Sequence, residues 1–262
     1  MKSGFVGIIG RPNVGKSTLL NSITGEKIAI ATEKPQTTRN RILGVYTALS
    51  EDEANGVQMV FIDTPGIHKP RNKLGGYMTR TAVDTLRDAD AVLFVADCAP
   101  FAGGGDARIL KLLEEITAPR IAVINKIDLL PPAAFKEIYD AYANREIFHN
   151  VVGVSALTGK NVPRLIEILR GLLADGPMFF PADAVTDKPE RFIVCELIRE
   201  KLLLYLDDEV PHGVAVEIES YEEMRGLTRI GAVIYCEKKS HKGMIIGKEG
   251  RKLKGVGKSA RA

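Results

Sequence analysis

The sequence has few cysteines, and its three thiols, Cys98, Cys195 and Cys236, lie far apart with no CxxC pair. This spacing argues against a structural metal site or a disulfide, and it predicts reduced, mostly buried thiols. No window holds about 18 uncharged apolar residues, so the sequence predicts no membrane-spanning helix. The N-terminal residues reach Arg11 before an apolar signal-peptide core could form, so no secretory leader is predicted.

The residues that are present have the composition of a globular protein, with 45% hydrophobic and 26% charged residues. The length of 262 residues suggests one large domain or two unequal ones. The net charge of +3 is unevenly distributed, since residues 238–262 hold nine Lys and Arg against one acid, whereas residues 176–237 hold six against thirteen. A basic closing segment indicates contact with nucleic acid or another acidic surface, and a solvated tail is the alternative.

The first two thirds of the chain alternate short apolar runs with helical patterns. The runs are GFVGIIG, QMVFID, AVLFVAD, RIAVIN and NVVGVSA. Continuous apolar strands separated by helices predict an α/β fold with a mostly parallel sheet. RILGVYTALS, joined to QMVFID through a polar turn, predicts a hairpin with one antiparallel strand at the edge of this sheet.

A second, smaller α+β unit is predicted after a proline-rich segment, GPMFFPADAVTDKPE, which is typical of a linker. RFIVCELIREKLLLYL predicts an amphipathic helix, and GVAVEIES and RIGAVIYCEK predict two strands before the basic end. We therefore expect domains at 1–175 and 191–262, joined by a linker at 176–190.

The stretch GRPNVGKS fits the pattern GxxxxGK[ST] and stands between an apolar strand and a helix. Its glycines let main-chain N–H groups face phosphates, and the positive end of the helix points to the same place. Lys16 is expected to reach the β- and γ-phosphates, and Ser17 to bind Mg²⁺. The residues predicted to bind nucleotide here are Gly10, Arg11, Pro12, Asn13, Val14, Gly15, Lys16, Ser17 and Thr18.

Two further motifs follow strands and should meet the phosphate-binding loop at the same edge of the sheet. In DTPG, Asp63 can hold Mg²⁺ through water, and Gly66 can offer its N–H to a γ-phosphate because no Cβ blocks the approach. In NKID, the Asp128 carboxylate can accept bonds from the adjacent N1–H and N2–H₂ donors that guanine has and adenine lacks. The residues predicted around the base are Asn125, Lys126 and Asp128, with Ser155, Ala156 and Leu157 supplying a main-chain N–H to the guanine O6.

The motifs GRPNVGKSTLLN, QTTRNR, DTPG, NKID and SAL, in this order, resemble the Era family of ribosome-associated GTPases over nearly the whole chain. The resemblance implies a translation-factor-class P-loop GTPase that binds GTP and GDP with Mg²⁺. In that family the threonine pair lies in the first switch, so we expect Thr38 to bind Mg²⁺ and sense the γ-phosphate, with Thr37 as the alternative. Lys16, Thr38 and Gly66 then form the expected catalytic set.

The turnover is expected to be slow. Many GTPases place a glutamine directly after DxxG to orient the attacking water, and here that position is Ile67. His68 follows and either assists the water or is merely exposed. Related GTPases with asparagine at the position of Asn13 can bind K⁺, which predicts K⁺ stimulation; a turn-stabilising side chain is the alternative.

Two other glycine-containing stretches do not fit a phosphate site. Gly257-Lys258-Ser259 repeats the end of a phosphate-binding loop, but the first glycine of such a loop would stand where Lys252 is. We therefore reject nucleotide binding there. Gly103-Gly104-Gly105 lacks the spacing of a phosphate-binding loop and predicts a flexible loop.

The stretch IGKEGR contains a GxxG loop between two short helical segments, a device that clamps about four nucleotides of RNA. Ile245, Ile246 and Leu253 either line an apolar platform for bases or form core, and Glu249 should repel phosphate somewhat. The residues predicted to bind RNA are Ile246, Gly247, Lys248, Glu249, Gly250, Arg251, Lys252 and Lys254.

After the α-β-β pattern, this loop resembles the type II KH domain that closes the Era family. The resemblance implies binding to the 3′ region of small-subunit (16S) ribosomal RNA and a role in assembly of the small ribosomal subunit. The family's KH domain continues with a third strand and a basic tail, so we expect its C-terminal part to be missing here and RNA binding to be weaker.

The resemblance also bears on location and on competing functions. We expect a cytoplasmic monomer; peripheral association with the inner face of the cell membrane is a family trait for which no anchor is encoded here. Two other functions stay open. One is an RNA-binding assembly module with a regulatory nucleotide site and negligible turnover, and the other is a GTPase acting on tRNA.

Overall fold

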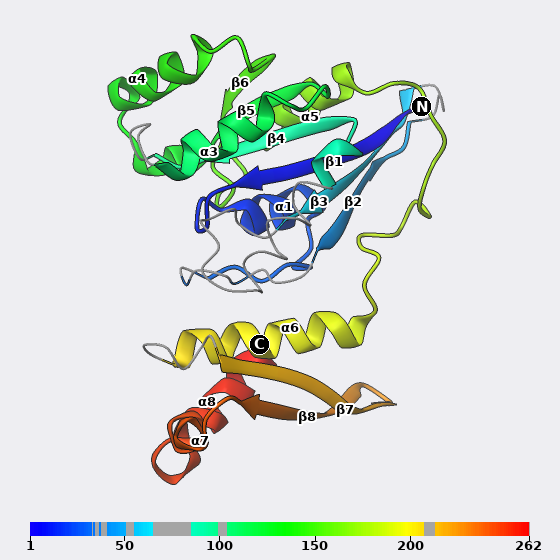
Figure 1. The fold of residues 1–262 in the computed structure, drawn as a ribbon. Coiled ribbons are helices and arrows are strands. Elements are labelled where there is room, and N and C mark those ends of the chain that lie inside the picture. The colour runs from blue at the N-terminus through cyan, green and yellow to red at the C-terminus, as the bar shows by residue number, and fades with distance from the viewer. Residues whose placement is uncertain are drawn as a thin grey trace. The chain divides into compact units, whose positions relative to one another are not determined.

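The computed structural model describes residues 1–32, 34, 37, 41–50, 55–64, 85–98, 104–206 and 213–261. The chain divides into two compact units (Figure 1). The first comprises Met1–Ala29 and Thr38–Asp187, and the second comprises Ile30–Thr37 and Lys188–Ala262. A short stretch from the N-terminal part of the sequence therefore belongs to the C-terminal unit.

The first unit is built on a six-stranded sheet with the order β2-β3-β1-β4-β5-β6. Neighbouring strands pair in parallel, except that β2 pairs antiparallel with β3 at the edge. The predicted mostly parallel sheet and its antiparallel edge strand are thus confirmed. The strands are β1 (Lys2–Gly10), β2 (Ile42–Ala48), β3 (Val57–Asp63), β4 (Ala91–Ala96), β5 (Arg120–Ile124) and β6 (Asn150–Gly153).

Helices flank this sheet (Figure 1). Strands β3 and β4 are buried along their whole length, and their sequences are apolar except for Gln58 and Asp63 on β3. Phe94 of β4 packs in one buried cluster with Ile109 and Tyr142 from two of the helices. The α-helices whose bounds the structure describes in this unit are α1 (Lys16–Thr24), α3 (Gly104–Leu113), α4 (Pro132–Ala143) and α5 (Val162–Leu172).

Most of the segment predicted as a linker is attached to the first unit. The Gln58 side chain on β3 donates to the Phe180 carbonyl at 2.9 Å. The Val45 N–H on β2 donates to the Val185 carbonyl at 2.9 Å. The segment therefore contacts β3 and then the edge strand β2, and it belongs to the first unit as far as Asp187.

The second unit holds the predicted helix and two strands, and then two short helices. Strands β7 and β8 form an antiparallel pair. The core of the second unit contains Leu202, Leu206, Val214, Ile245 and Val256. No helix in the part of the chain that the structure describes is long and apolar enough to cross a membrane. The elements are α6 (Glu190–Tyr205), β7 (Val214–Met224), β8 (Leu227–Cys236), α7 (Lys239–Ile246) and α8 (Arg251–Ala260).

The flexible loop predicted for the triple glycine is wrong in part, because α3 begins at Gly104; Gly103 lies outside the described residues. Asp106 stands in the first turn of this helix, where a carboxylate complements the positive end of the helix dipole. The same carboxylate accepts a hydrogen bond from Arg11 Nε at 2.8 Å. These two contacts stabilise a helix start that the glycines alone disfavour.

Candidate functional site

The phosphate-binding loop connects β1 to α1 and comes very close to two neighbouring strands. Gly10 ends β1, and a Cβ there would lie 2.3 Å from the Val95 carbonyl oxygen. Gly15 precedes α1 with a φ of 96°, and a Cβ there would lie 2.2 Å from Asn125 Nδ2. Both positions therefore require glycine, for close approach and, at Gly15, also for the left-handed backbone.

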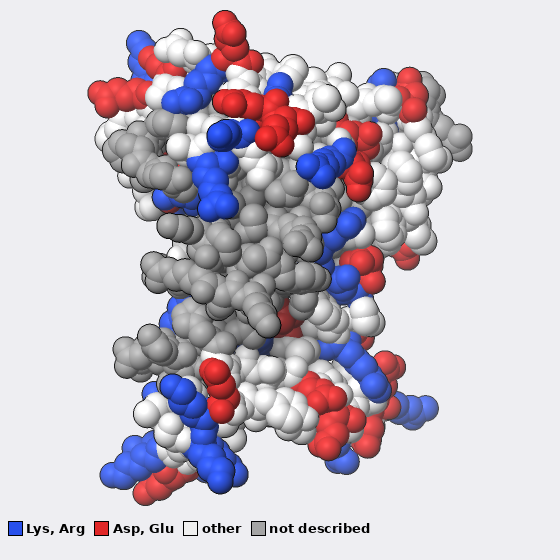
Figure 2. Space-filling view, in the orientation of Figure 1, with Lys and Arg blue, Asp and Glu red and all other residues white. Residues whose placement is uncertain are grey.

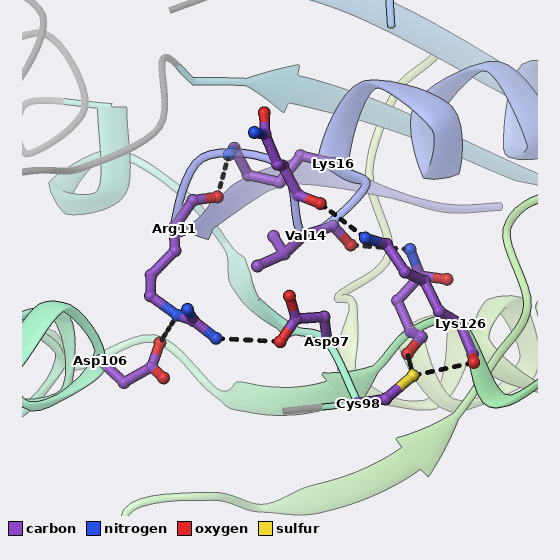
Figure 3. A network of polar contacts seen from close by, with 9 residues as sticks. Arg11, Val14, Lys16, Asp97, Cys98, Asp106 and Lys126 are labelled. Atoms are coloured by element: carbon purple, nitrogen blue, oxygen red, sulfur yellow. Dashed lines mark hydrogen bonds and ion pairs between the residues drawn. The ribbon is translucent and has the colours of Figure 1, made fainter. Parts of the chain in front are cut away.

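Lys16 is buried with its ammonium above this loop. The ammonium donates to the Arg11 carbonyl at 2.9 Å (Figure 3) and to the Gly10 carbonyl at 3.3 Å. Burial lowers the pKa of Lys16 to about 8, and the nearby Asp63 charge offsets part of this effect. Phosphate oxygens could take the place of these neutral acceptors and would hold the lysine charge far better.

Ser17 and Asp63 meet at the bottom of the site, where β3 ends beside α1. Ser17 Oγ donates to Asp63 Oδ2 at 2.7 Å, and Asp63 is fully buried. Burial raises the pKa of Asp63, whereas the Lys16 charge and the Ser17 bond act to lower it. Asp63 Oδ1 is buried with no hydrogen-bond partner among the described residues. An orphaned carboxylate oxygen beside a hydroxyl fits Mg²⁺, which prefers oxygen ligands.

Asn125, in the NKID motif, joins this motif to the phosphate-binding loop and to SAL through one side chain. Its Nδ2 donates to the Val14 carbonyl at 2.9 Å, and its Oδ1 accepts the Ala156 N–H at 2.9 Å. The next residue, Lys126, donates from its ammonium to the Asn13 carbonyl at 2.8 Å (Figure 3). The loops that follow β1, β5 and β6 are therefore brought together, as the sequence order predicted.

The residues expected around the base differ in exposure. Asp128 lies in a single 3₁₀ turn, Ile127–Leu129, and its side chain is exposed. Ser155 is buried and Leu157 is exposed. Because the Ala156 N–H is engaged by Asn125, Ala156 supports the other loops here rather than presenting this N–H to solvent.

Arg11 was predicted to bind nucleotide, but its side chain points to two carboxylates (Figure 3). Its Nε lies 2.8 Å from Asp106 Oδ1, and its Nη2 lies 2.9 Å from Asp97 Oδ1. Neither aspartate was predicted as part of the site. The available signal was the position of Asp97 directly after the strand AVLFVA, because carboxyl ends of parallel strands share one edge.

The three cysteines are free and half-buried, less buried than predicted. Cys98 lies nearest the site, where its thiol donates to the Lys126 carbonyl at 2.9 Å (Figure 3). Burial raises the pKa of the Cys98 thiol, so the thiol stays neutral and keeps its hydrogen. It therefore acts as a hydrogen-bond donor that steadies the loop after β5.

The remaining predicted residues of the nucleotide site are only partly described by the structure. Thr38, Gly66, Ile67 and His68 lie outside the described residues. Thr37 is buried, and its hydroxyl donates to the Lys34 carbonyl at 2.6 Å. Mg²⁺ binding by Thr38, with Thr37 as the alternative, stays a prediction. The φ of 66° at Asn13 fits a role in the turn, and K⁺ binding there stays a prediction.

The GxxG loop lies between α7 and α8 with three left-handed residues. The φ angles are 72° at Gly247, 53° at Glu249 and 73° at Gly250. A Cβ at Gly247 would lie 2.9 Å from Lys252 Cγ. The loop therefore needs its first glycine for space as well as for conformation.

Basic side chains gather around this loop, and Figure 2 shows Lys and Arg clustered at the end of the second unit that carries α7 and α8. Lys248, Arg251 and Lys254 are exposed, and Lys252 is half-buried. Glu249 sits among them and pairs with Arg251, with 3.2 Å between Oε2 and Nη2. The acid therefore neutralises part of the loop's positive charge.

The apolar residues beside the loop divide between the two roles left open by the sequence. Ile245 is 5% exposed and belongs to the core of the second unit, whereas Ile246 is 37% and Leu253 38% exposed. Only the last two can contact a base. The second GKS lies inside α8, where Ser259 Oγ is 2.9 Å from the Tyr205 hydroxyl, so it forms no phosphate-binding loop.

The chain matches the family models "50S ribosome-binding GTPase" over residues 5–126 and "KH domain" over residues 209–262. GTPase Era from Alkaliphilus oremlandii is 56% identical over 262 residues, which cover 99% of this chain and 87% of the relative. GTPase Era from Clostridioides difficile is 53% identical, covering 99% of this chain and 86% of the relative.

Two solved structures resemble the whole chain. A variant of Aquifex aeolicus Era bound to GDP and AlF₄⁻ has a TM-score of 0.91 at 36% identity, covering 100% of this chain and 88% of that one. Era in complex with MgGDPNP and nucleotides 1506–1542 of 16S ribosomal RNA has a TM-score of 0.90 at 36% identity, covering 100% of this chain and 87% of that one.

Proposed function

Because the chain belongs to the Era family of GTPases, we propose that it hydrolyses GTP to GDP and phosphate and binds the 3′ region of small-subunit ribosomal RNA. In this proposal the first unit is the GTPase and the second reads RNA, and together they assist assembly of the small ribosomal subunit. The cytoplasm is the expected location because that is where this RNA is found in a bacterial cell.

The main support for nucleotide binding in the first unit is the pair of hydrogen bonds made by the Asn125 side chain. Its two hydrogen bonds, each of 2.9 Å, hold the phosphate-binding loop and the loop after β6 together at one edge of the sheet. Lys16 then binds the β- and γ-phosphates, and the exposed Asp128 accepts the two guanine N–H groups. Preorganised loops of this kind lower the entropy cost of positioning that phosphoryl transfer requires.

Ser17 and Asp63 would hold Mg²⁺, which supplies charge stabilisation to the phosphates when bound. Ser17 would contribute its hydroxyl directly, and Asp63 would contribute its unpaired Oδ1 through water. Thr38 and Gly66 complete the proposed catalytic set on the basis of their motifs. Ile67 cannot orient water by a hydrogen bond, so the intrinsic turnover is slow.

The guanine assignment is tested by the substitution Asp128→Asn. The amide reverses one hydrogen bond, since its NH₂ donates where the carboxylate accepted, so it suits xanthine, which has an oxygen at C2. The affinity for GTP should fall by about 100-fold or more, and the affinity for xanthosine triphosphate should rise. Asp140→Asn, on the exposed face of α4, is the matched control and should change neither affinity.

The proposal fails if both triphosphates weaken equally in Asp128→Asn while the control is normal, because that result would place the aspartate in a structural role. A finding that the wild-type chain binds ATP as well as GTP would also contradict it.

The K⁺ proposal needs a separate measurement. Asn13 lies in the phosphate-binding loop with its carbonyl held by Lys126, and its side-chain oxygen is the atom that would bind K⁺. Single-turnover hydrolysis should be faster in KCl than in NaCl at equal ionic strength. Equal rates would assign Asn13 to the turn alone.

A further inference from the structure

The Arg11 side chain ties the first half of the phosphate-binding loop to two other parts of the first unit. Its Nε donates to Asp106 Oδ1 at 2.8 Å, and its Nη2 donates to Asp97 Oδ1 at 2.9 Å. Asp97 directly follows β4, and Asp106 stands in the first turn of α3. One guanidinium therefore joins the loop after β1, the end of β4 and the start of α3. These three residues are called the Arg11 clamp below.

Both carboxylates of the Arg11 clamp stand on well-packed parts of the fold. The Ala96 carbonyl, beside Asp97, accepts the Asn125 N–H at 2.8 Å. Asp106 is 1% exposed and lies one turn before Ile109, which is fully buried in the core of this unit. The two carboxylates are therefore held in place by main-chain bonds and by the core, unlike the side chains of an exposed ion pair, which stay mobile.

The burial of Asp106 makes its contact with Arg11 specific. A buried carboxylate is costly unless an opposite charge and hydrogen bonds compensate it. Burial raises the pKa of Asp106, and the charge and the hydrogen bond of Arg11 act to lower it. Arg11 thus supplies compensation that Asp106 needs, and a guanidinium with two charge-assisted bonds is strongly oriented by them.

Arg11 meets Lys16 through its main chain and not through its side chain. The Lys16 ammonium donates to the Arg11 carbonyl at 2.9 Å, and from that residue the guanidinium extends to the two aspartates (Figure 3). The orientation of the guanidinium therefore fixes the part of the loop that faces Lys16, the residue assigned above to the β- and γ-phosphates.

The phosphate-binding loop is thus held from two sides. On the β5 side, the Asn13 carbonyl accepts a bond from the Lys126 ammonium at 2.8 Å, and the Val14 carbonyl accepts one from Asn125 Nδ2 at 2.9 Å. On the β4 side, the hold is the Arg11 clamp. Loss of the clamp would leave the second half of the loop attached and the first half less restricted.

We propose that Arg11, Asp97 and Asp106 are positioning residues of the nucleotide site, which hold the phosphate-binding loop in the shape that accepts the β- and γ-phosphates. The guanidinium itself does not contact phosphate. A loop that is held before binding needs less ordering when the phosphates arrive, so the clamp lowers the entropy cost of binding and of phosphoryl transfer. This inference rests on the proposed function, from which it takes the phosphates as ligands.

The variant Asp106→Ala tests the inference directly, because two roles of Arg11 predict opposite results. If Arg11 acts through the clamp, loss of the Asp106 carboxylate loosens the loop, and the Kd for GDP should rise about tenfold. If the guanidinium binds phosphate instead, the substitution frees it, and the Kd for GDP should stay equal or fall. That second result would overturn the inference. Arg11→Gln should raise the Kd for GDP to a similar extent.

Guanosine separates positioning from damage to the fold, because it carries the base and no phosphate. Its Kd, measured by competition, should be unchanged in Asp106→Ala and in Arg11→Gln. An equal loss of affinity for GDP and guanosine would assign the clamp to the fold alone and overturn the inference. Arg164→Gln, which removes an exposed ion pair with Glu167 on α5, is the matched control and should change neither Kd.

Asp97→Ala tests the clamp at its more exposed carboxylate, and it serves if the change at the buried Asp106 prevents folding. The Kd for GDP should rise, but by less, because Arg11 keeps its bond to Asp106. An unchanged Kd for GDP in this variant would contradict the inference.

A double variant tests whether the partners act through one contact. Arg11→Gln combined with Asp106→Ala should bind GDP no more weakly than Arg11→Gln alone, because both changes remove the same contact. Effects that multiply would show that the two residues act independently and would overturn the inference. If the wild-type chain binds GDP no more tightly than guanosine, the proposed function fails instead, so the two failures are distinguishable.

Discussion

At the scale of single residues, Lys16 shows how burial sets the chemistry of a binding group. Its ammonium is held by two main-chain carbonyls, and its pKa is lowered to about 8, well under the usual 10.5 of lysine. Phosphate oxygens favour the charged form and raise this pKa again when nucleotide binds. The free and bound proteins therefore come to differ in proton content as the pH rises through 8.

This difference predicts a pH dependence for nucleotide affinity. At pH 7 and below, about one unit under this pKa, Lys16 carries its proton in both states, and affinity should not change on its account. Above pH 8 the free protein has lost a proton that the complex keeps, so binding takes up a proton and affinity falls, approaching tenfold per pH unit. Calorimetry between pH 7 and 9, in buffers of different ionisation enthalpy, measures the uptake. An absence of proton uptake at pH 9 would contradict the assigned role.

Asn125 is a residue whose replacement by alanine should lower the stability of the first unit. Asn125→Ala leaves the buried Val14 carbonyl and the buried Ala156 N–H without their partner. The free energy of unfolding of the first unit should fall by about 2 kcal/mol or more, and nucleotide affinity should fall with it. Asn144→Ala, at the exposed end of α4, is the control and should change stability by less than about 0.5 kcal/mol. Urea titrations of the wild-type chain and of the two variants measure these free energies of unfolding. Equal stabilities of all three proteins would show that the two Asn125 hydrogen bonds do not hold the loops together.

At the scale of elements, the GxxG loop should be sensitive to its two glycines to different degrees. Gly247 has a φ of 72° and a ψ of 173°, which is a region open essentially only to glycine. Gly250 has a φ of 73° with open space around its Cα. Gly250→Ala should cost the second unit about 1–2 kcal/mol, and Gly247→Ala should cost more because its Cβ also meets Lys252.

The matched control is Gly226→Ala, at the turn between β7 and β8, where φ is 72° and no atom lies within 4 Å of the added Cβ. It should match Gly250→Ala in stability and leave RNA affinity unchanged, whereas both loop variants should weaken RNA binding. If all three variants bind RNA with equal affinity, the GxxG loop does not contact the RNA.

The sequence predicted elements well where a period or a motif is local. Strands β3 and β4 were found from apolar runs, and β2 was placed at the edge because a short polar turn joins it to β3. The start of α3 was missed because its stabilising contact, from Arg11 to Asp106, spans 95 positions. The contacts of Arg199 with Thr37 and of Glu200 with Ala31 were missed for a related reason, since these side chains of α6 bind main-chain groups, which have no sequence signature.

The same distinction holds for the site. The nucleotide motifs were found because each has a fixed spacing and follows a strand. The roles of Asp97 and Ala156 depend on side chains from other loops and needed coordinates. For Ile245, Ile246 and Leu253, sequence could not separate core from surface, because all three are equally apolar and only packing divides them.

At the scale of the whole molecule, the account places two different ligands on two units. We propose that guanine nucleotide binds at the loops at the carboxyl ends of β1, β3, β5 and β6, and that RNA binds at the loop between α7 and α8. Phosphate contacts dominate RNA affinity and depend strongly on salt, so charge alone would also produce some binding. Sequence dependence is what separates a reading site from a merely basic surface.

The most direct test is therefore a binding titration of this chain with a single-stranded RNA that matches the 3′ end of 16S ribosomal RNA, beside a scrambled RNA of equal length and composition. Both are titrated at one fixed salt concentration with GDPNP, with GDP and without nucleotide. The account predicts tighter binding of the matched RNA, strengthened by GDPNP, and loss of this preference in Gly247→Ala. Equal binding of both RNAs, with a steep salt dependence and no effect of nucleotide, would contradict it.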